Sequence, residues 1–222
     1  IHHLDQALTE LDLVDAPNEE LCQVLIAAGR THLSAGDSRL SKTCYQQALG
    51  LIDEGRDTRL YAQAMHGMGT IYEATRRFKQ ATDCFRVALS IQRSGMIHDA
   101  EYLADIVATL LSFGSLHEKQ GNLDLALSCF TEAYRMCHAQ DHNHAADVEK
   151  ATSLASMGWV YHTKGCLKLA MTMYRDSIAL LRPLLGEHRN VAAVLIKIGM
   201  IFVEEGRDQR AAEVYKEALR MQ

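Results

Sequence analysis

The sequence predicts an all-α protein, an α-solenoid of antiparallel helix pairs. Five glycines recur every 40 to 45 residues along the 222-residue chain, at Gly29, Gly69, Gly114, Gly158 and Gly199. Around each glycine lie two apolar stretches with helical spacing, and a turn signal separates them. No insertion or deletion occurs inside any copy, whereas the spacing between copies varies. A fixed internal frame with variable spacing is typical of a repeat solenoid.

Each copy of the frame has the same landmarks. An aliphatic residue stands four positions before the glycine, and a histidine or aromatic ring stands three positions after it. A small residue follows at twelve positions, a tyrosine or phenylalanine at sixteen and a second small residue at nineteen. The first copy consists of Leu25, Gly29, His32, Ser41, Tyr45 and Ala48. In the second to fifth copies, the ring sixteen positions after the glycine belongs to Phe85, Phe130, Tyr174 and Tyr215.

The glycine in each frame falls in the middle of a predicted helix. A glycine there costs about 1 kcal/mol relative to alanine. Five repetitions of that cost indicate a packing reason, because a missing side chain lets another helix approach closely. The small residues do the same on the second helix, and the ring between them fills the remaining space. The unit is therefore a tightly crossing pair of helices.

The predicted elements follow in chain order. Residues 1–16 fit a second helix from a preceding, truncated repeat. Five helix pairs come next, at about 19–58, 59–103, 104–147, 148–188 and 189–222. Glycine marks the turn inside four of them, at Gly36, Gly121, Gly165 and Gly206. The second copy has Arg76 and Arg77 there instead. Glycine is favoured just past a helix end, since it adopts a left-handed backbone at little cost.

The frame resembles the tetratricopeptide repeat (TPR), in which a small residue and a ring in the first helix precede Ala, an aromatic residue and Ala in the second. The resemblance covers residues ~19 to 222 and implies a right-handed superhelix. The early tryptophan and the closing proline of that family are missing, and the period exceeds its usual length of about 34 residues. The segment 184–192, Leu-Leu-Gly-Glu-His-Arg-Asn-Val-Ala, is similar to the inter-repeat linker of kinesin light chains and related long-period TPR proteins.

Composition restricts the function classes. The net charge is −5 and the basic residues are scattered, which argues against nonspecific nucleic-acid binding. No secretory signal or membrane span is predicted. The most apolar stretch, 191–203, contains Lys197 and is too short to cross a bilayer. We therefore expect no membrane insertion.

Six cysteines occur without paired spacing. Cys44, Cys84 and Cys129 share one position, directly before the second-helix ring, which indicates small apolar packing residues. Reduced thiols predict a cytoplasmic, reducing environment. The chain starts inside a predicted helix and ends with another, without a polar capping helix. We expect a segment of a longer protein or a piece covered by other subunits; a natural boundary with a frayed last helix is the alternative.

The TPR resemblance also implies a binding surface, because the first helices of that family line a concave groove. The groove residues carried over for repeats two to five are Gln63, His66, Thr70, Glu73, Leu111, Ser115, Glu118, Lys119, Trp159, His162 and Met200. No repeat has the Lys–Asn pair of the carboxylate clamp that binds chaperone tails, and the asparagine pair of kinesin light chains is missing.

Trp159 is the only tryptophan of the chain and falls at a groove position. Buried tryptophan is enriched among binding hot spots, so Trp159 is the best single candidate for a partner contact. With His162 and Met200 it would form an apolar floor for an extended or helical peptide. The alternative is a structural role, with the ring packed toward the next repeat near Met200.

The segment 137–144, Cys-His-Ala-Gln-Asp-His-Asn-His, contains thiolate, imidazole and carboxylate ligands. A polar connection explains it as well, because no second cluster completes a zinc site, and a pH-sensitive loop is a further alternative. Catalytic motifs such as Gly-x-Ser-x-Gly and His-Glu-x-x-His are missing. We expect no enzymatic activity, no catalytic residues, no metal and no cofactor.

These observations favour a scaffold or adaptor that binds a peptide or partner subunit in its groove. A structural subunit of a large assembly, which contacts its neighbours through its ends and convex face, is the second reading. A metal-binding or enzymatic protein that uses the 137–144 loop is the third.

Overall fold

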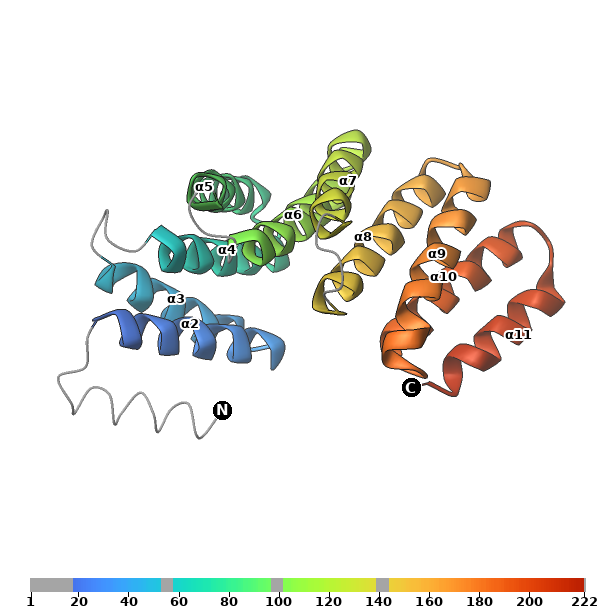
Figure 1. The fold of residues 1–222 in the computed structure, drawn as a ribbon, viewed down its shortest axis with the longest axis horizontal. Coiled ribbons are helices and arrows are strands. Elements are labelled where there is room, and N and C mark those ends of the chain that lie inside the picture. Colours follow the sequence, from blue (N-terminus) through green and yellow to red (C-terminus); the bar gives the residue numbers. More distant parts are fainter. Residues whose placement is uncertain (1–17, 53–57, 97–101, 139–143, 222) are drawn as a thin grey trace. The chain divides into compact units, whose positions relative to one another are not determined.

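The computed structural model describes residues 18–52, 58–96, 102–138, 144–221. Every regular element in these ranges is an α-helix, as the frame predicts (Figure 1). The helices are α2 (Asn18–Ser34), α3 (Ser38–Leu51), α4 (Thr58–Ala74), α5 (Phe78–Met96), α6 (Tyr102–Lys119), α7 (Leu123–His138), α8 (His144–Thr163), α9 (Leu167–Leu185), α10 (Arg189–Glu204) and α11 (Asp208–Leu219). None of them is long and apolar enough to span a bilayer.

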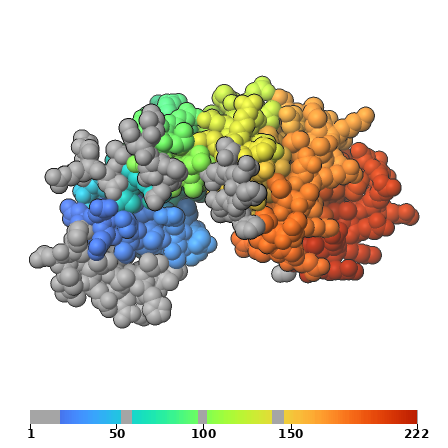
Figure 2. Space-filling model, viewed as in Figure 1, coloured from blue at the N-terminus to red at the C-terminus, as the bar shows by residue number. Residues whose placement is uncertain are grey.

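The chain divides into two compact units, here called the N-terminal unit (Ile1–Ser112) and the C-terminal unit (Phe113–Gln222). Each unit is built from antiparallel helix pairs. In the N-terminal unit, α2 packs on α3 and α4 on α5. In the C-terminal unit, α8 packs on α9 and α10 on α11 (Figure 1), and their atoms form a continuous surface in the space-filling view (Figure 2).

The frame glycines are where the second-helix rings pack. A Cβ atom on the glycine would lie 2.8 Å from the Tyr45 ring at Gly29, 2.7 Å from Phe85 at Gly69, 2.5 Å from Phe130 at Gly114 and 2.7 Å from Tyr174 at Gly158. At Gly199 it would overlap the ring of Tyr215. The ring comes from the second helix of the same repeat in every copy, sixteen residues later. The frame position is therefore occupied by glycine because the ring of the second helix packs directly against the first-helix backbone.

Tyr45 is enclosed more tightly than the other rings. A Cβ atom on Gly67, in the first helix of the next repeat, would also overlap it. The ring thus lies between Gly29 on α2 and Gly67 on α4, and it is 1% exposed. Burial raises the pKa of its hydroxyl to about 12. Two repeats of the N-terminal unit are therefore joined through one aromatic side chain.

Two serines replace alanine at the small landmarks, and both hydroxyls are used. Ser41 donates to the carbonyl of Gly29 over 2.7 Å, and Ser177 donates to the carbonyl of Ala151 over 2.7 Å. Each bond joins the two helices of one repeat. Both serines are fully buried, where an unpaired hydroxyl would be costly.

The turns inside the pairs have one geometry. The residue after the turn glycine donates its N–H to the carbonyl of the first-helix ring residue, as in the bond from Asp37 to His32 over 2.9 Å. This bond defines a Schellman motif, which requires a left-handed residue. The turn glycines have φ between 70° and 85°, and Arg76 has φ 58° at the same position. The second repeat therefore keeps the motif, but Arg76 takes a backbone conformation that is unfavourable for a residue with a side chain.

The second helices differ in their N-terminal caps. Asp37 accepts hydrogen bonds from the N–H groups of Arg39 and Leu40 at the start of α3, over 3.1 and 2.9 Å. Cys166 occupies the equivalent position before α9 and makes no side-chain cap bond. Aspartate is among the best N-cap residues, so α3 begins with an advantage that α9 lacks.

Gln92 is a buried polar residue of the N-terminal unit whose amide has no hydrogen-bond partner among the described residues. It lies on α5 and is 0% exposed. Cys137 and Leu181 follow the frame glycine of the third and fourth repeats at the same distance as Gln92 follows Gly69, and both are buried. Gln92 is therefore an amide in an apolar position.

Candidate functional site

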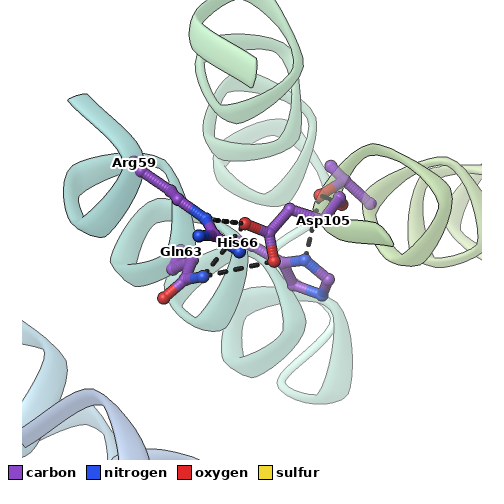
Figure 3. Close-up of polar contacts among 5 residues, drawn as sticks. Arg59, Gln63, His66 and Asp105 are labelled. Carbon is purple, nitrogen blue, oxygen red and sulfur yellow. Dashed lines mark hydrogen bonds and ion pairs between the residues drawn. The ribbon is translucent and has the colours of Figure 1, made fainter. Parts of the chain in front are cut away.

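Polar side chains connect successive first helices in both units. In the N-terminal unit they join α4 to the start of α6 (Figure 3). In the C-terminal unit they join α8 to the end of α6 and to α10. The partners are 41 to 46 residues apart, which is about one repeat. These contacts involve five of the predicted groove residues, Gln63, His66, Glu118, Trp159 and His162.

Asp105 is the centre of the first cluster (Figure 3). Its carboxylate accepts hydrogen bonds from Arg59 Nε over 2.8 Å and from Gln63 Nε2 over 3.0 and 3.2 Å. The Arg59 guanidinium also lies 5.7 Å from the centre of the Tyr102 ring. The carboxylate is thus paired with a charged and a neutral donor, both from α4.

His66 forms the second part of this cluster, and the bonds define its tautomer. The Thr109 hydroxyl donates its only proton to the carbonyl of Asp105 over 2.8 Å. His66 Nδ1, which is 3.0 Å from that hydroxyl, must therefore donate to it. Nε2 is then the acceptor, and Ser112 Oγ donates to it over 3.2 Å. A neutral imidazole therefore has partners on both ring nitrogens only when its proton is on Nδ1.

The electrostatics agree with a neutral ring. Burial lowers the pKa of His66 to about 4, Asp105 opposes that shift and Arg30 adds to it. The shift means that solvation lost by the imidazolium outweighs the attraction of the nearby carboxylate. Both nitrogens of the neutral His66 imidazole are therefore hydrogen-bonded within the protein. We call this the closed cluster.

Trp159 is the centre of the C-terminal cluster. Its indole Nε1–H donates to Glu118 Oε1 over 3.0 Å. The ammonium of Lys197, on α10, lies over the ring at 4.1 Å from its centre. The His162 ring meets the indole edge-on, with ring centres 5.5 Å apart. The half-buried tryptophan therefore contacts charged or polar groups from the neighbouring first helices on both sides.

His162 extends this cluster to α10. Its Nε2 lies 2.7 Å from Glu204 Oε1, and its side chain is 7% exposed whereas that of Glu204 is 50% exposed. Its Nδ1 is buried without a hydrogen-bond partner among the described residues. The cluster thus places a buried imidazole beside a carboxylate that reaches solvent.

Lys197 is the cation of the cluster. Burial lowers the pKa of its ammonium, and the Glu118 carboxylate partly opposes that shift. The first-helix residues at the same frame position are Ala27, Gly67, Ser112 and Ser156. Lys197 is therefore a long charged side chain where the other repeats have a small one.

The remaining residues of the predicted groove take several positions. Thr70 donates to the carbonyl of His66, one turn earlier on its own helix, over 3.1 Å. Glu73 is 7% exposed. Leu111, Ser115 and Met200 are half-buried, and Lys119 is exposed. The structure therefore brings Gln63 and His66 into one cluster, and Glu118, Trp159 and His162 into the other.

Sequence reasoning missed Asp105, Thr109 and Lys197. For Asp105 and Thr109 the signal was present, because each lies about one repeat from a groove residue that it contacts. Asp105 is 42 residues from Gln63, and Thr109 is 43 residues from His66. The sequence analysis considered that Trp159 packs near Met200 and did not consider Lys197. Lys197 is the α10 residue that lies over the indole.

Most of the 137–144 segment lies outside the described residues, which include Cys137 and His138 at its start. Cys137 is buried near the end of α7, and burial with neighbouring acidic side chains of α8 raises the pKa of its thiol to about 11. A protonated thiol is a poor metal ligand. In the ranges the structure covers, no group of three or more histidine, cysteine or acidic side chains is placed to hold a metal ion.

Solved structures share this fold over nearly the whole chain. BtubC from P. vanneervenii is 16% identical with a TM-score of 0.75, and the match covers 98% of this chain and 86% of that one. A Rap protein complexed with competence and sporulation factor is 13% identical with a TM-score of 0.76, covering 98% of this chain and 58% of that one.

A protein from Podosopora anserina, described as a kinesin light chain with nearly identical TPR-like repeats, is 14% identical with a TM-score of 0.67; the match covers 94% and 97% of the two chains. At these identities the likeness is one of fold. No curated protein sequence matches the chain.

The family follows from the sequence directly. The model of the tetratricopeptide repeat family matches residues 20–94 and 149–222, about two thirds of the chain. These ranges contain four of the five glycine frames, and the glycine–ring contact of the third frame is the same as in the others. The chain belongs to the tetratricopeptide repeat family.

Proposed function

We propose that this chain is a protein-interaction scaffold that binds a peptide or partner segment on the face of its first helices. The observation that carries the proposal is the environment of Trp159. This half-buried indole is surrounded by charged side chains from α6 and α10, at the position where the family resemblance places partner contacts. Tryptophan in such a setting is enriched among binding hot spots.

The hydrogen bonds between first helices give this face a fixed geometry before a partner arrives. His66 and Asp105 join α4 to α6, and His162 joins α8 to α10. Side chains that are already ordered lose little entropy on binding, so more of the contact energy remains as affinity. The clusters therefore support a preorganised binding surface within each unit.

Family membership supports the same proposal. The Rap protein with the same fold was solved with competence and sporulation factor bound, so this architecture accommodates a partner in at least one relative. For the present chain, a peptide or protein partner and a cytoplasmic location are parts of the proposal.

Selection from a random peptide library tests it. Peptides selected on the unmodified protein are measured by isothermal titration against Glu118→Gln and against Glu213→Gln, which makes the same charge change on the exposed side of α11. We expect Glu118→Gln to weaken binding at least about tenfold, because it removes the charge of one partner in a partly buried polar contact. Equal affinities for both variants, or a loss only with Glu213→Gln, would contradict binding on the first-helix face.

A further inference from the structure

The Trp159 ring already holds a cation. The Lys197 ammonium lies 4.1 Å from the ring centre, well inside the range of a cation–π contact. Tryptophan has the most favourable ring for this interaction. The protein's own side chain therefore shows what kind of group this face attracts.

Two carboxylates of the Trp159 cluster have acceptor capacity left, one bonded to the indole and the other to His162. Glu118 receives the indole N–H on Oε1, and Glu204 lies against His162 through Oε1. No described residue donates a hydrogen bond to the second oxygen of either group. A carboxylate offers about four acceptor sites, so both groups can accept further donors.

Lys197 contacts the Trp159 ring but donates no hydrogen bond to the carboxylates of Glu118 and Glu204. Its ammonium donates no hydrogen bond to any oxygen of the described residues, although it has three donors. Burial also lowers its pKa despite the Glu118 carboxylate, which means that the ammonium has lost more solvation than its neighbours return. The resident cation is therefore held weakly.

An arginine side chain would use both features. Its planar guanidinium stacks on an indole and carries five donors in a fixed fork that suits carboxylates. We propose that Trp159, Glu118 and Glu204 form a recognition site for an arginine of the bound peptide, and that Lys197 occupies this site until the partner displaces it. The inference rests on the proposed function and specifies the partner of the same face.

An acidic partner that pairs with Lys197 is the competing possibility. The Glu118 carboxylate bonds the indole, the Glu204 carboxylate lies against the neighbouring His162, and both would repel an incoming carboxylate. One weakly held ammonium does not outweigh them. The charges of the cluster therefore favour a basic partner.

The experiment removes the Lys197 ammonium by mutation and adds a small arginine derivative as a probe. Acetyl-arginine amide is titrated at constant ionic strength into the unmodified protein and into Lys197→Met, which keeps the side-chain stem. Trp159 is the only tryptophan, so its fluorescence and its indole N–H resonance report on this site alone. We expect Lys197→Met to bind the probe about tenfold more tightly, because it removes a competing cation–π contact.

Three comparisons make the result specific. Acetyl-lysine amide, free at its side chain, should bind Lys197→Met more weakly than the arginine probe. Glu118→Gln added to Lys197→Met should abolish the gain. Lys168→Met, which removes an exposed lysine of α9, should behave like the unmodified protein. Lys197→Gln replaces the methionine variant if that variant does not fold by circular dichroism.

The proposal is overturned if the arginine probe leaves the Trp159 signals of Lys197→Met unchanged, or if Glu118→Gln does not reduce its binding. It is also overturned if sodium acetate, and not the arginine probe, shifts these signals in the unmodified protein, because that result assigns the site to an acidic partner. Library peptides that need Glu118 but show no enrichment of arginine would contradict this inference alone. Peptides that bind elsewhere would contradict the proposed function, while the probe titration still decides the cation site.

Discussion

The two units use the same frame for clusters of opposite character. In the N-terminal unit, His66 has a partner on each ring nitrogen and Asp105 accepts from two side chains. In the C-terminal unit, Trp159 contacts the Glu118 carboxylate and the Lys197 ammonium, Glu204 lies against His162, and all three charged groups keep unused hydrogen-bonding capacity. The frame therefore determines how helices pack, whereas the residues between its landmarks decide whether a face is closed or open to a partner.

The difference has a physical basis in charge. A buried neutral imidazole is satisfied by two hydroxyl groups at little cost. Asp105 and Arg59 pair with each other, whereas charged groups without such a partner keep part of their solvation, stay near the surface and remain available. We expect the N-terminal cluster to contribute mainly to stability and the C-terminal cluster mainly to binding.

Substitutions two residues before the frame glycine should affect the unfolding free energies of the two units most differently. Gly67→Ala would push a methyl group into Tyr45, which cannot move away because Gly29 lies on its other side. We expect a loss of about 2–3 kcal/mol in the free energy of unfolding, since overpacking outweighs the helix propensity gained. Urea unfolding followed by circular dichroism measures it.

Ser156→Ala is the matched change in the C-terminal unit, and it adds no volume. We expect its unfolding free energy to stay within about 0.5 kcal/mol of the unmodified protein. If Gly67→Ala is as mild as Ser156→Ala, the ring of Tyr45 is not confined as described.

The closed cluster should also make stability depend on pH. The pKa of His66 is about 4 in the folded protein, below its ordinary value near 6.5, so the unfolded chain binds a proton first as the pH falls. The stability from neutral burial is therefore complete above pH 6.5 and is lost progressively toward pH 4. Between pH 7 and pH 5 we expect a loss of about 2 kcal/mol.

His66→Gln is the control, because glutamine is polar and does not titrate. Its unfolding free energy should fall less between pH 7 and pH 5 than that of the unmodified protein, by about the same 2 kcal/mol. Equal pH dependence in both proteins would show that His66 is not the group responsible.

The buried amide of Gln92 offers a way to raise the stability of the N-terminal unit. Leu181 occupies the equivalent position of the fourth repeat, in the C-terminal unit, and is 3% exposed. We expect Gln92→Leu to raise the unfolding free energy by about 1–2 kcal/mol, because it removes the cost of an unpaired buried amide. Leu181→Gln should have the opposite effect, and a lower melting temperature for Gln92→Leu would mean that the amide has a partner in the folded protein.

The smallest expected effect concerns the helix caps. Cys166→Asp gives α9 the residue type that caps α3 through Asp37. A new acceptor at the N-cap should stabilise the C-terminal unit by about 1 kcal/mol. Thermal unfolding followed by Trp159 fluorescence measures that unit, and Cys166→Ala, which cannot cap, should show no gain.

Much of the fold could be predicted from single residues. The frame glycines indicated close helix packing, and each contacts the ring sixteen residues later. Arg76 and Arg77 marked the one turn without glycine, and Arg76 takes the left-handed conformation there. These features depend on spacing inside a repeat, which is constant and therefore visible in one sequence.

The chemistry of the site was harder to predict, because it depends on contacts between repeats. The spacing between frames varies from 40 to 45 residues, so the register of one first helix against the next is not fixed by the sequence pattern. Glu118 could therefore be placed on the binding face, while its bond to Trp159 and the position of Lys197 required the structure.

The Schellman motif within each pair has a consequence for engineering the chain. Because one hydrogen bond links the residue after each turn to the ring residue of the first helix, an added amino acid in the turn would break that bond and shift the second helix against the first. Tags, linkers or circular permutation sites are therefore better tolerated behind a second helix than between the two members of a pair.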